Sequence, residues 1–310
     1  MRVMPNDIPE QRLYRVAVVM NAKAGALLAQ RDDGSAALVE LFAKHGLQAH
    51  CIGNESGTLP ERIAAALADQ PDAVVVAGGD GTVACAAQIM HGKTDIPLGV
   101  LPFGTVNLLA KDLRLPIGDT AAAIAALACG KMQAIDVAEV NGHLFLCAAM
   151  LGLPTHLGRH REHMRGEKLK SVVRLPLATL RNVLRPNPLR GELAVAGQKI
   201  RIKASAATVT VNPMEEATGL RFARQKLDGG TLVFYEVRAW GIAGWVKFVA
   251  RVLARRWRHD PAEREWSAER MRLHSLGTPA LHVMVDGEIR LLTPPLDFIC
   301  HPRALNVLVG

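Results

Sequence analysis

One stretch of ten residues, 73–82, constrains the fold more than any other part of the chain. It reads Ala-Val-Val-Val-Ala-Gly-Gly-Asp-Gly-Thr. The β-branched run Val74–Val76 predicts a strand that is buried on both faces. The turn Gly78–Thr82 follows this strand, and a helix-compatible run, Val83–Met90, follows the turn. The chain therefore predicts a strand, a glycine-rich turn and a helix in direct succession.

The turn has the composition of a phosphate-binding loop. Gly78, Gly79 and Gly81 allow backbone angles that a Cβ atom forbids, and they leave backbone N–H groups open to a ligand. Between the carboxyl end of a strand and the amino end of a helix, such N–H groups and the helix dipole favour phosphate. Asp80 would repel phosphate unless it holds a magnesium ion or accepts a proton. The alternative is an ordinary turn in which Asp80 or Thr82 caps the helix.

A second strand and turn of the same form follow. The apolar strand Leu98–Leu101 leads into the loop Pro102–Asn107, and a helix-like run comes next. Gly104, Thr105 and Asn107 offer backbone and side-chain donors to ribose or phosphate. Open α/β sheets bind ligands in a crevice at the carboxyl ends of their strands. We therefore expect the two loops to form one site.

The wider pattern and the length of 310 residues predict two domains. From Arg15–Met20 onward, apolar strands alternate with helical runs, which predicts a parallel sheet with right-handed crossovers. After the turn Asn141-Gly142, alternating strand patterns predict an antiparallel β-rich domain. We expect the α/β domain at residues 14–138. The β-rich domain is expected at residues 139–310, and its last strands can return to the first domain.

Composition narrows the range of partners and compartments. A formal charge of +8 and a pI near 9.5 point to an anionic partner, such as nucleotide, nucleic acid or acidic membrane. An aromatic content of 4% argues against nucleic acid, because single-strand sites stack bases on aromatic rings. The scattered, odd-numbered cysteines suit a reducing cytosol. The sequence shows neither a signal peptide nor a spanning helix, so we expect a cytoplasmic protein whose membrane contact is peripheral.

Two basic segments lie in the second half of the chain. Residues 159–170 are interpreted as a solvated basic face. Residues 242–258 predict an amphipathic helix with one apolar face, formed by Ile242, Trp245, Val246, Val249, Val252, Leu253 and Trp257. Its cationic stripe consists of Lys247, Arg251, Arg255 and Arg258. Two interpretations stay open: a helix that covers the sheet with its charges in water, and an interface with anionic lipid.

These motifs together resemble one family of kinases. Gly-Gly-Asp-Gly-Thr resembles the signature of diacylglycerol kinases, sphingosine kinases and NAD kinases. Three further segments resemble the lipid-kinase branch: the turn 21–25, the loop Pro102–Asn107 and the late Asp286-Gly287-Glu288. The Asn-Glu motif of NAD kinases has no counterpart after the glycine loop. From about residue 16 to 307, the chain thus resembles the bacterial diacylglycerol kinase-like lipid kinases.

The resemblance implies a Rossmann-like or phosphofructokinase-like nucleotide-binding domain that is followed by a sandwich-like β domain. It implies a lipid kinase that transfers the γ-phosphoryl group of ATP to a lipid hydroxyl, in a cleft between the two domains. It implies that Asp80 lies beside Mg²⁺ and the γ-phosphate, and that Glu288 is the general base. The residues implied to bind ATP are Asn21, Gly78, Gly79, Gly81, Thr82, Gly104, Thr105 and Asn107. The acceptor stays open among diacylglycerol, monoacylglycerol, a sphingoid base and phosphatidylglycerol. The alternatives are a catalytically weak nucleotide- and membrane-binding regulator, and a kinase of soluble substrates such as NAD.

Of the departures from the pattern of that family, the one at residues 228–233 matters most. The family carries an Asp-Asp-Gly-x-Leu-Asp turn, whose second Asp helps to hold a structural magnesium ion. Here residues 228–233 read Asp-Gly-Gly-Thr-Leu-Val. Gly229 and Val233 stand where the family has acids, so this magnesium site depends on Asp228. Asp286 is expected to act mainly through the tight hairpin turn that it forms with Gly287.

Overall fold

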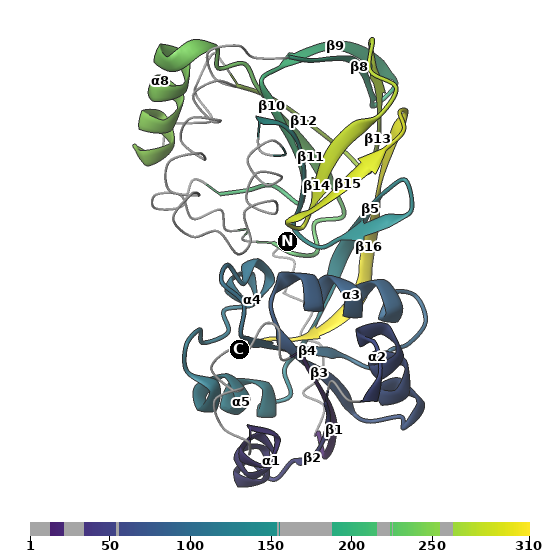
Figure 1. Ribbon diagram of the computed structural model, residues 1–310, viewed down its shortest axis with the longest axis vertical. Coiled ribbons are helices and arrows are strands. Elements are labelled where there is room, and N and C mark those ends of the chain that lie inside the picture. The colour runs from purple at the N-terminus through teal and green to yellow at the C-terminus, as the bar shows by residue number, and fades with distance from the viewer. Residues whose placement is uncertain are drawn as a thin grey trace, which may run out of the picture. The chain divides into compact units, whose positions relative to one another are not determined.

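The structure is a computed structural model that describes residues 13–21, 34–53, 56–153, 155, 188–215, 224, 226–254 and 263–310. The described residues form two compact units (Figure 1). The first unit takes in those of Met1–Ile135 and Arg303–Gly310, and the second takes in those of Asp136–Pro302. Strands β5 (Met132–Val140) and β16 (Leu296–Leu308) contribute residues to both units.

The first unit is built on a parallel sheet with the strand order β2-β1-β3-β4-β16. Its strands are β1 (Arg15–Met20), β2 (Gln48–Ile52), β3 (Ala73–Gly78), β4 (Leu98–Pro102) and the end of β16. All four pairings are parallel. Every residue of β3 is buried, as the apolar run predicts for a strand that is covered on both faces.

Helices cover both faces of this sheet (Figure 1). The helices are α1 (Gly34–Lys44), α2 (Leu59–Ala68), α3 (Asp80–Met90), α4 (Leu108–Asp112) and α5 (Thr120–Ala128). Helices α2 and α3 contact each other on one side, and α1 contacts α5 on the other. These alternating strands and helices confirm the predicted α/β class of the first unit.

Local hydrogen bonds set where the helices begin. The N–H of Thr58 donates to Glu61 Oε2 at 2.8 Å before α2, and Asp119 Oδ1 accepts from the N–H of Ala122 at 3.0 Å before α5. Helix α3 begins at Asp80, which is earlier than the predicted run from residue 83. The reason is that the N–H groups of residues 82 and 83 both donate to the Gly79 carbonyl, at 2.9 and 3.1 Å. The glycine-rich turn therefore forms the first turn of the helix.

The second unit is an antiparallel sandwich, which confirms the predicted class. One sheet has the order β12-β11-β10-β7-β14-β15, and the other contains β16-β13-β8-β9. The strands are β6 (His143–Phe145), β7 (Ala148–Gly152), β8 (Leu189–Val195), β9 (Gln198–Ala204), β10 (Ala206–Val211), β11 (Leu232–Val237), β12 (Glu263–Ala268), β13 (Arg270–Ser275), β14 (Leu281–Val285) and β15 (Glu288–Leu292). Strand β6 pairs with β5 across the predicted Asn141-Gly142 turn.

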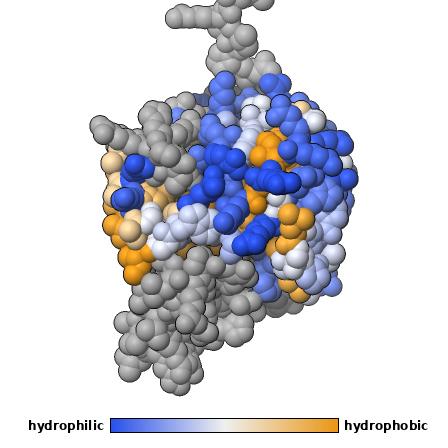
Figure 2. All heavy atoms as spheres, turned by 90° about the horizontal axis from the view of Figure 1, so that it is seen from above, coloured by the Kyte–Doolittle hydropathy of each residue, from blue (hydrophilic) through white to orange (hydrophobic). Residues whose placement is uncertain are grey.

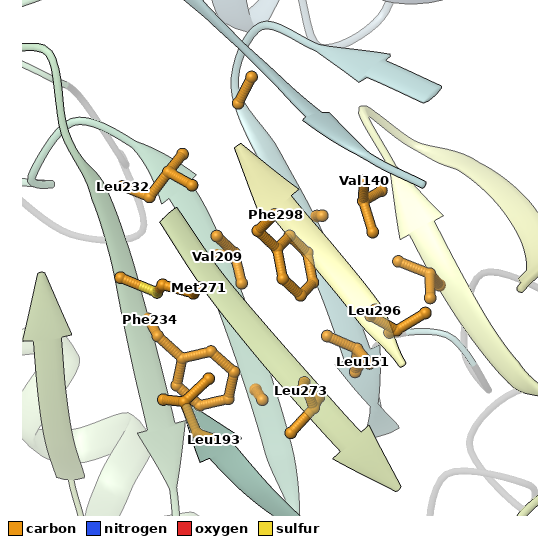
Figure 3. Close-up of a cluster of buried hydrophobic side chains, with 14 of the residues drawn as sticks. Val140, Leu151, Leu193, Val209, Leu232, Phe234, Met271, Leu273, Leu296 and Phe298 are labelled. Carbon is orange, nitrogen blue, oxygen red and sulfur yellow. The ribbon is translucent and has the colours of Figure 1, made fainter. Parts of the chain in front are cut away.

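Apolar side chains from both sheets meet in one core (Figure 3). Leu193, Met271 and Phe298 come from one sheet, and Val209 and Phe234 come from the other. All of them are buried, so the sandwich is held mainly by the removal of apolar surface from water.

The strand prediction was incomplete in the second unit. The apolar run 144–148 has the pattern of one strand, but β6 ends at Phe145 and β7 begins at Ala148. The chain breaks there because the N–H groups of residues 146, 147 and 148 donate to the Asp286 carboxylate. Strands β12, β13 and β15 were not predicted, because exposed charged residues interrupt their short apolar patterns.

Helix α8 (Gly241–Leu253) packs on β11 in the second unit. Within the described ranges, no helix has both the length and the apolar character that a membrane span requires.

Candidate functional site

The strand order of the first sheet marks one place for a ligand. In the order β2-β1-β3-β4, the chain passes from β1 to its neighbour β2 on one side. From β3 it passes to its neighbour β4 on the opposite side. Open α/β sheets bind ligands outside the carboxyl ends of their strands at such a reversal. Asn21 follows β1 directly and Gly79 follows β3 directly, so both predicted residues lie at this point.

Hydrogen bonds join the ends of β1 and β3. The N–H of Asn21 donates to the Ala77 carbonyl at 3.0 Å, and Asn21 Nδ2 donates to Thr82 Oγ1 at 2.9 Å. Thr82 is buried, and its side chain fills the space beside Gly78. A Cβ atom at Gly78 would lie 2.4 Å from Thr82 Oγ1, so a larger residue does not fit there. Asn21 and Thr82 therefore fix the shape of the first loop.

The two glycine-rich loops touch backbone to backbone. A Cβ atom at Gly79 would lie 3.1 Å from Gly104 Cα, and a Cβ atom at Gly104 would lie 2.5 Å from Gly79 Cα. In addition, the N–H of Phe103 donates to the Gly78 carbonyl at 3.0 Å. The structure thus brings together the two loops that the sequence predicted to share a site, and it shows why glycine is needed at the contact.

Asp80 links the first loop to the helix after the second. Its Oδ2 accepts from the N–H of Asn107 at 3.0 Å, and its Oδ1 accepts from the N–H of Leu108 at 2.6 Å. The carboxylate therefore caps the start of α4. Asp80 is half-buried, and each carboxylate oxygen has a second lone pair. A metal ion can bind such an oxygen without breaking these hydrogen bonds.

The Asn107 side chain is used inside the second loop. Its Oδ1 accepts from the N–H of Gly104 at 2.9 Å, and its Nδ2 donates to the Gly104 carbonyl at 2.7 Å. Asn107 is buried and has a φ of 52°, a left-handed conformation that asparagine tolerates. Of the predicted ATP-binding residues, Gly81 and Thr105 are exposed, and Gly79 and Gly104 are half-buried.

Arg62 is a charged residue at this edge that the sequence analysis missed. It lies on α2, is 4% exposed, and its Nη1 donates to the Met20 carbonyl at the end of β1. Its Nε has no hydrogen-bond partner, and among the described residues no carboxylate pairs with it. The sequence offered one signal of its burial: Arg62 lies four residues before Ala66, on the apolar face of the same helix. The guanidinium adds positive charge near the first loop, which favours an anionic ligand.

Glu288, the predicted base, lies in the second unit at the start of β15. Asp286 and Gly287 have φ values of 44° and 92°, which confirms the predicted tight turn between β14 and β15. Glu288 is exposed, and its Oε2 accepts from Arg290 Nη2 at 2.8 Å. The carboxylate is therefore accessible to a substrate.

Asp286 does more than form this turn. Its carboxylate is buried and accepts from the N–H groups of Leu146, Cys147 and Ala148 at 2.6, 3.0 and 2.9 Å. Burial raises the pKa of the Asp286 carboxyl, and the N–H donors and the charge of Arg224 oppose that rise. Glu288 lies on the same hairpin as Asp286. Asp286 thus anchors this hairpin to the junction between β6 and β7.

The second unit does not fit the structural magnesium ion that the family resemblance implies. Asp136 Oδ2 accepts from Asn212 Nδ2 at 2.8 Å and from the N–H of Gly230 at 2.6 Å. A Cβ atom at Gly229 would lie 2.5 Å from Asn212 Oδ1, so the asparagine occupies the space of an acidic side chain. The oxygen that fills this space, Asn212 Oδ1, belongs to a neutral amide and has no hydrogen-bond partner among the described residues. In the part of the chain that the structure describes, no group of three His, Cys, Asp or Glu residues could hold a metal.

The predicted basic helix is only partly within the structure. Lys247 and Arg251 are exposed on α8. Arg255, Trp257 and Arg258 lie outside the described residues, as do the turn 22–25 and the basic segment 159–170.

The first unit defines a class: an α/β domain whose two glycine-lined loops meet at the reversal point of a parallel sheet. Residues 15–140 match the diacylglycerol kinase catalytic domain family. This match agrees with the family resemblance that the motifs predicted.

Individual relatives agree with this assignment. The diacylglycerol kinase of Mycobacterium tuberculosis is 39% identical over 90 residues, which cover 29% of this chain and 29% of that protein. The diacylglycerol kinase of Staphylococcus saprophyticus is 29% identical over 164 residues, or 51% of this chain and 50% of that protein. The chain thus spans half or less of the length of these curated relatives.

Solved structures extend the likeness in fold to nearly the whole chain. A diacylglycerol kinase from Bacillus anthracis has a TM-score of 0.71 at 19% identity, and the match covers 97% of this chain and 99% of that chain. An NAD kinase from Archaeoglobus fulgidus, solved in complex with ATP, has a TM-score of 0.50 at 12% identity, covering 95% of this chain and 93% of that chain. At these identities the likeness supports the fold alone.

Proposed function

We propose that this protein is an ATP- and Mg²⁺-dependent lipid kinase that acts at a membrane surface. The observation that carries the proposal is the backbone contact of Gly79 with Gly104, which joins two ligand-facing loops at the reversal point of the sheet. The family match over residues 15–140 supports kinase chemistry. The names of the relatives favour a diacylglycerol-like acceptor.

The first unit is proposed to bind the triphosphate. The first N–H groups of a helix have no partner within that helix, and α3 begins at Asp80. The exposed backbone of Gly81 and the exposed Thr105 can donate to phosphate, and the positive end of the α3 dipole favours it. Such donors supply the positioning and charge stabilisation on which phosphoryl transfer depends.

Asp80 is proposed to hold the magnesium ion. Mg²⁺ in kinase sites binds one or two carboxylates together with substrate phosphates, so a single half-buried carboxylate fits this donor set. When bound, the ion would supply charge neutralisation at the phosphates. The hydrogen bonds from Asp80 to α4 would at the same time hold the second loop in place.

Glu288 is proposed to be the general base. During transfer, the lipid O–H bond breaks and the proton passes to the carboxylate, while the lipid oxygen bonds to the γ-phosphorus and ADP leaves with the electrons of the old bond. Asp286 would act as a positioning residue, because it fixes the turn that precedes Glu288.

The test is incubation of the protein with γ-labelled ATP, Mg²⁺ and a mixed lipid extract. The expected result is labelled lipid, and chromatography of the product identifies the acceptor among diacylglycerol, monoacylglycerol, sphingoid bases and phosphatidylglycerol. Labelled product without any lipid would instead support a kinase of soluble substrates such as NAD. Binding of ATP without labelled product would support a regulator on the same fold.

A further inference from the structure

Helix α8 is attached to the second unit by one narrow face. Val252 is 7% exposed and packs with Val233 and Tyr235 of β11, and Phe248 packs against the same cluster. The ring of Trp245 meets that of Phe248 edge-on, with centroids 5.8 Å apart. These contacts cover the side of α8 that faces β11.

A second apolar row on α8 points away from this cluster. Ile242, Val246, Val249 and Leu253 are 49%, 61%, 43% and 56% exposed. Their spacings of four, three and four place them in one stripe. The predicted apolar face is therefore only partly covered, because its arc is wider than the contact with β11. Single exposed apolar residues are common, but a continuous row of four marks a contact surface.

Cations border the same exposed arc. Since successive helical residues turn by about 100°, Ala243 and Ala250 lie between the apolar row and the exposed Lys247 and Arg251. From Arg238 to His259 the sequence contains no acidic residue. The outward arc of α8 thus combines large apolar side chains, small alanines and positive charge.

We propose that this arc docks the protein on an anionic lipid bilayer. The apolar row would enter the boundary between headgroups and acyl chains, and Lys247 and Arg251 would meet lipid phosphates. The alanines allow the helix backbone to come close to the headgroups. Figure 2 shows apolar surface at the left edge of this view, on the side where α8 lies in Figure 1, besides other apolar patches nearer the middle of the face. The inference rests on the proposed function only in its choice of a lipid surface as the partner.

Charge favours a bilayer over a second copy of this chain. A symmetric dimer through α8 would place the same surface of each copy against the other. Lys247 and Arg251 would then oppose cations, because α8 has no acidic residue, and each chain carries a formal charge of +8. An anionic membrane attracts this surface instead.

The proposal is tested by sedimentation of the full-length protein with vesicles in the absence of ATP. Vesicles of phosphatidylcholine with phosphatidylglycerol are compared with vesicles of phosphatidylcholine alone. The double variant Val246→Ser, Leu253→Ser should bind anionic vesicles about tenfold more weakly or worse, because it removes two exposed apolar groups from the contact. Leu276→Ser is the matched control, because Leu276 is 63% exposed in the same unit but lies outside α8.

A second pair of substitutions separates charge from apolar contact. Lys247→Gln with Arg251→Gln should weaken binding to anionic vesicles at low salt and have little effect at high salt. The serine variants should stay weak at both salt concentrations. Melting temperatures close to that of the wild type would show that each variant is folded.

Several outcomes would overturn the docking proposal. Equal binding of the wild type to neutral and anionic vesicles would do so, and so would wild-type affinity of the double serine variant. Loss of a dimer in gel filtration with unchanged vesicle binding would show that α8 is an interface between copies. Wild-type activity on a short-chain, water-soluble diacylglycerol is measured separately. Its absence alongside the expected vesicle binding would contradict the kinase proposal and leave the docking surface standing.

Discussion

At the scale of single residues, two carboxylates that lie two positions apart have opposite environments. Asp286 is buried under three backbone N–H donors, whereas Glu288 is exposed beside Arg290. A buried carboxylate with several donors stabilises the fold, and an exposed one is free to take a proton from a substrate. Under the proposed function, this hairpin would combine a positioning residue, Asp286, with a catalytic residue, Glu288.

Substitution at these two positions should give opposite results. Asp286→Asn should lower the free energy of unfolding by about 3 kcal/mol, because the amide offers one acceptor and turns an NH₂ group toward N–H donors. Glu288→Gln should change stability by less than about 0.5 kcal/mol and lower kcat by about 10²–10⁴-fold. Denaturant unfolding and lipid-kinase assays measure both effects. A stable Asp286→Asn protein with no activity would instead make Asp286 the base.

The cysteines offer a second test at this scale. Burial raises the pKa of the Cys51 thiol to about 11 and that of the Cys300 thiol to about 12. Only about one Cys51 thiol in a thousand is then ionised at pH 8, and the thiolate is the reactive form. Iodoacetamide should therefore label the exposed Cys129 well before Cys51 and Cys300, as followed by peptide mass spectrometry. Labelling of Cys51 as fast as Cys129 would show that Cys51 is not buried in this way.

At the scale of elements, the site depends on how closely two loops approach. A side chain at Gly104 would collide with the Gly79 backbone, so the loops must separate if one is added. The hydrogen bonds that Asp80 accepts from the N–H groups of Asn107 and Leu108 hold the same two segments together. The affinity for nucleotide should therefore follow the geometry of this contact.

Gly104→Ala should weaken ATP binding about tenfold or more, because its Cβ atom would lie 2.5 Å from Gly79 Cα. Isothermal titration with Mg²⁺·ATP measures the change. Gly244→Ala is a matched control, because its Cβ atom would meet its nearest neighbour at an ordinary 3.5 Å. Equal ATP affinity of both variants would mean that the loop contact does not shape the nucleotide site.

The second unit should keep its structure without a divalent metal. Asp136 is held directly by Asn212 and Gly230, so a chelator should leave amide protection in β10 and β11 unchanged in hydrogen-exchange measurements. Asn212→Ala should increase exchange in the same strands, because it removes one hydrogen-bond donor from the buried Asp136 carboxylate. Faster exchange in the wild type after chelation would reveal a structural metal that these residues do not show.

At the scale of the whole molecule, the features that the sequence predicted correctly are those that local sequence patterns determine. The strands β1 and β3 and both glycine loops follow from apolar runs and turns within a few residues. The contacts that give the loops and the hairpin their shape join distant residues: Asp80 bonds Asn107, 27 positions away, and Asp286 bonds Leu146, 140 positions away. No local sequence pattern predicts hydrogen bonds between residues so far apart in the chain. The exposed part of the apolar face of α8 was also not predictable, because it depends on how much of the helix β11 covers.

The central claim is that the paired glycine loops bind ATP for phosphoryl transfer to a lipid. The most direct measurement is the rate at which label passes from γ-labelled ATP to diacylglycerol in mixed micelles, for the wild type and for Asp80→Asn. The wild type should transfer label only with Mg²⁺, and Asp80→Asn should be slower by about 10²-fold or more, because it loses the carboxylate charge. The asparagine keeps one of the two acceptors that cap α4, so the variant should still fold. Transfer by Asp80→Asn at the wild-type rate, or no labelled lipid from the wild type, would contradict the account.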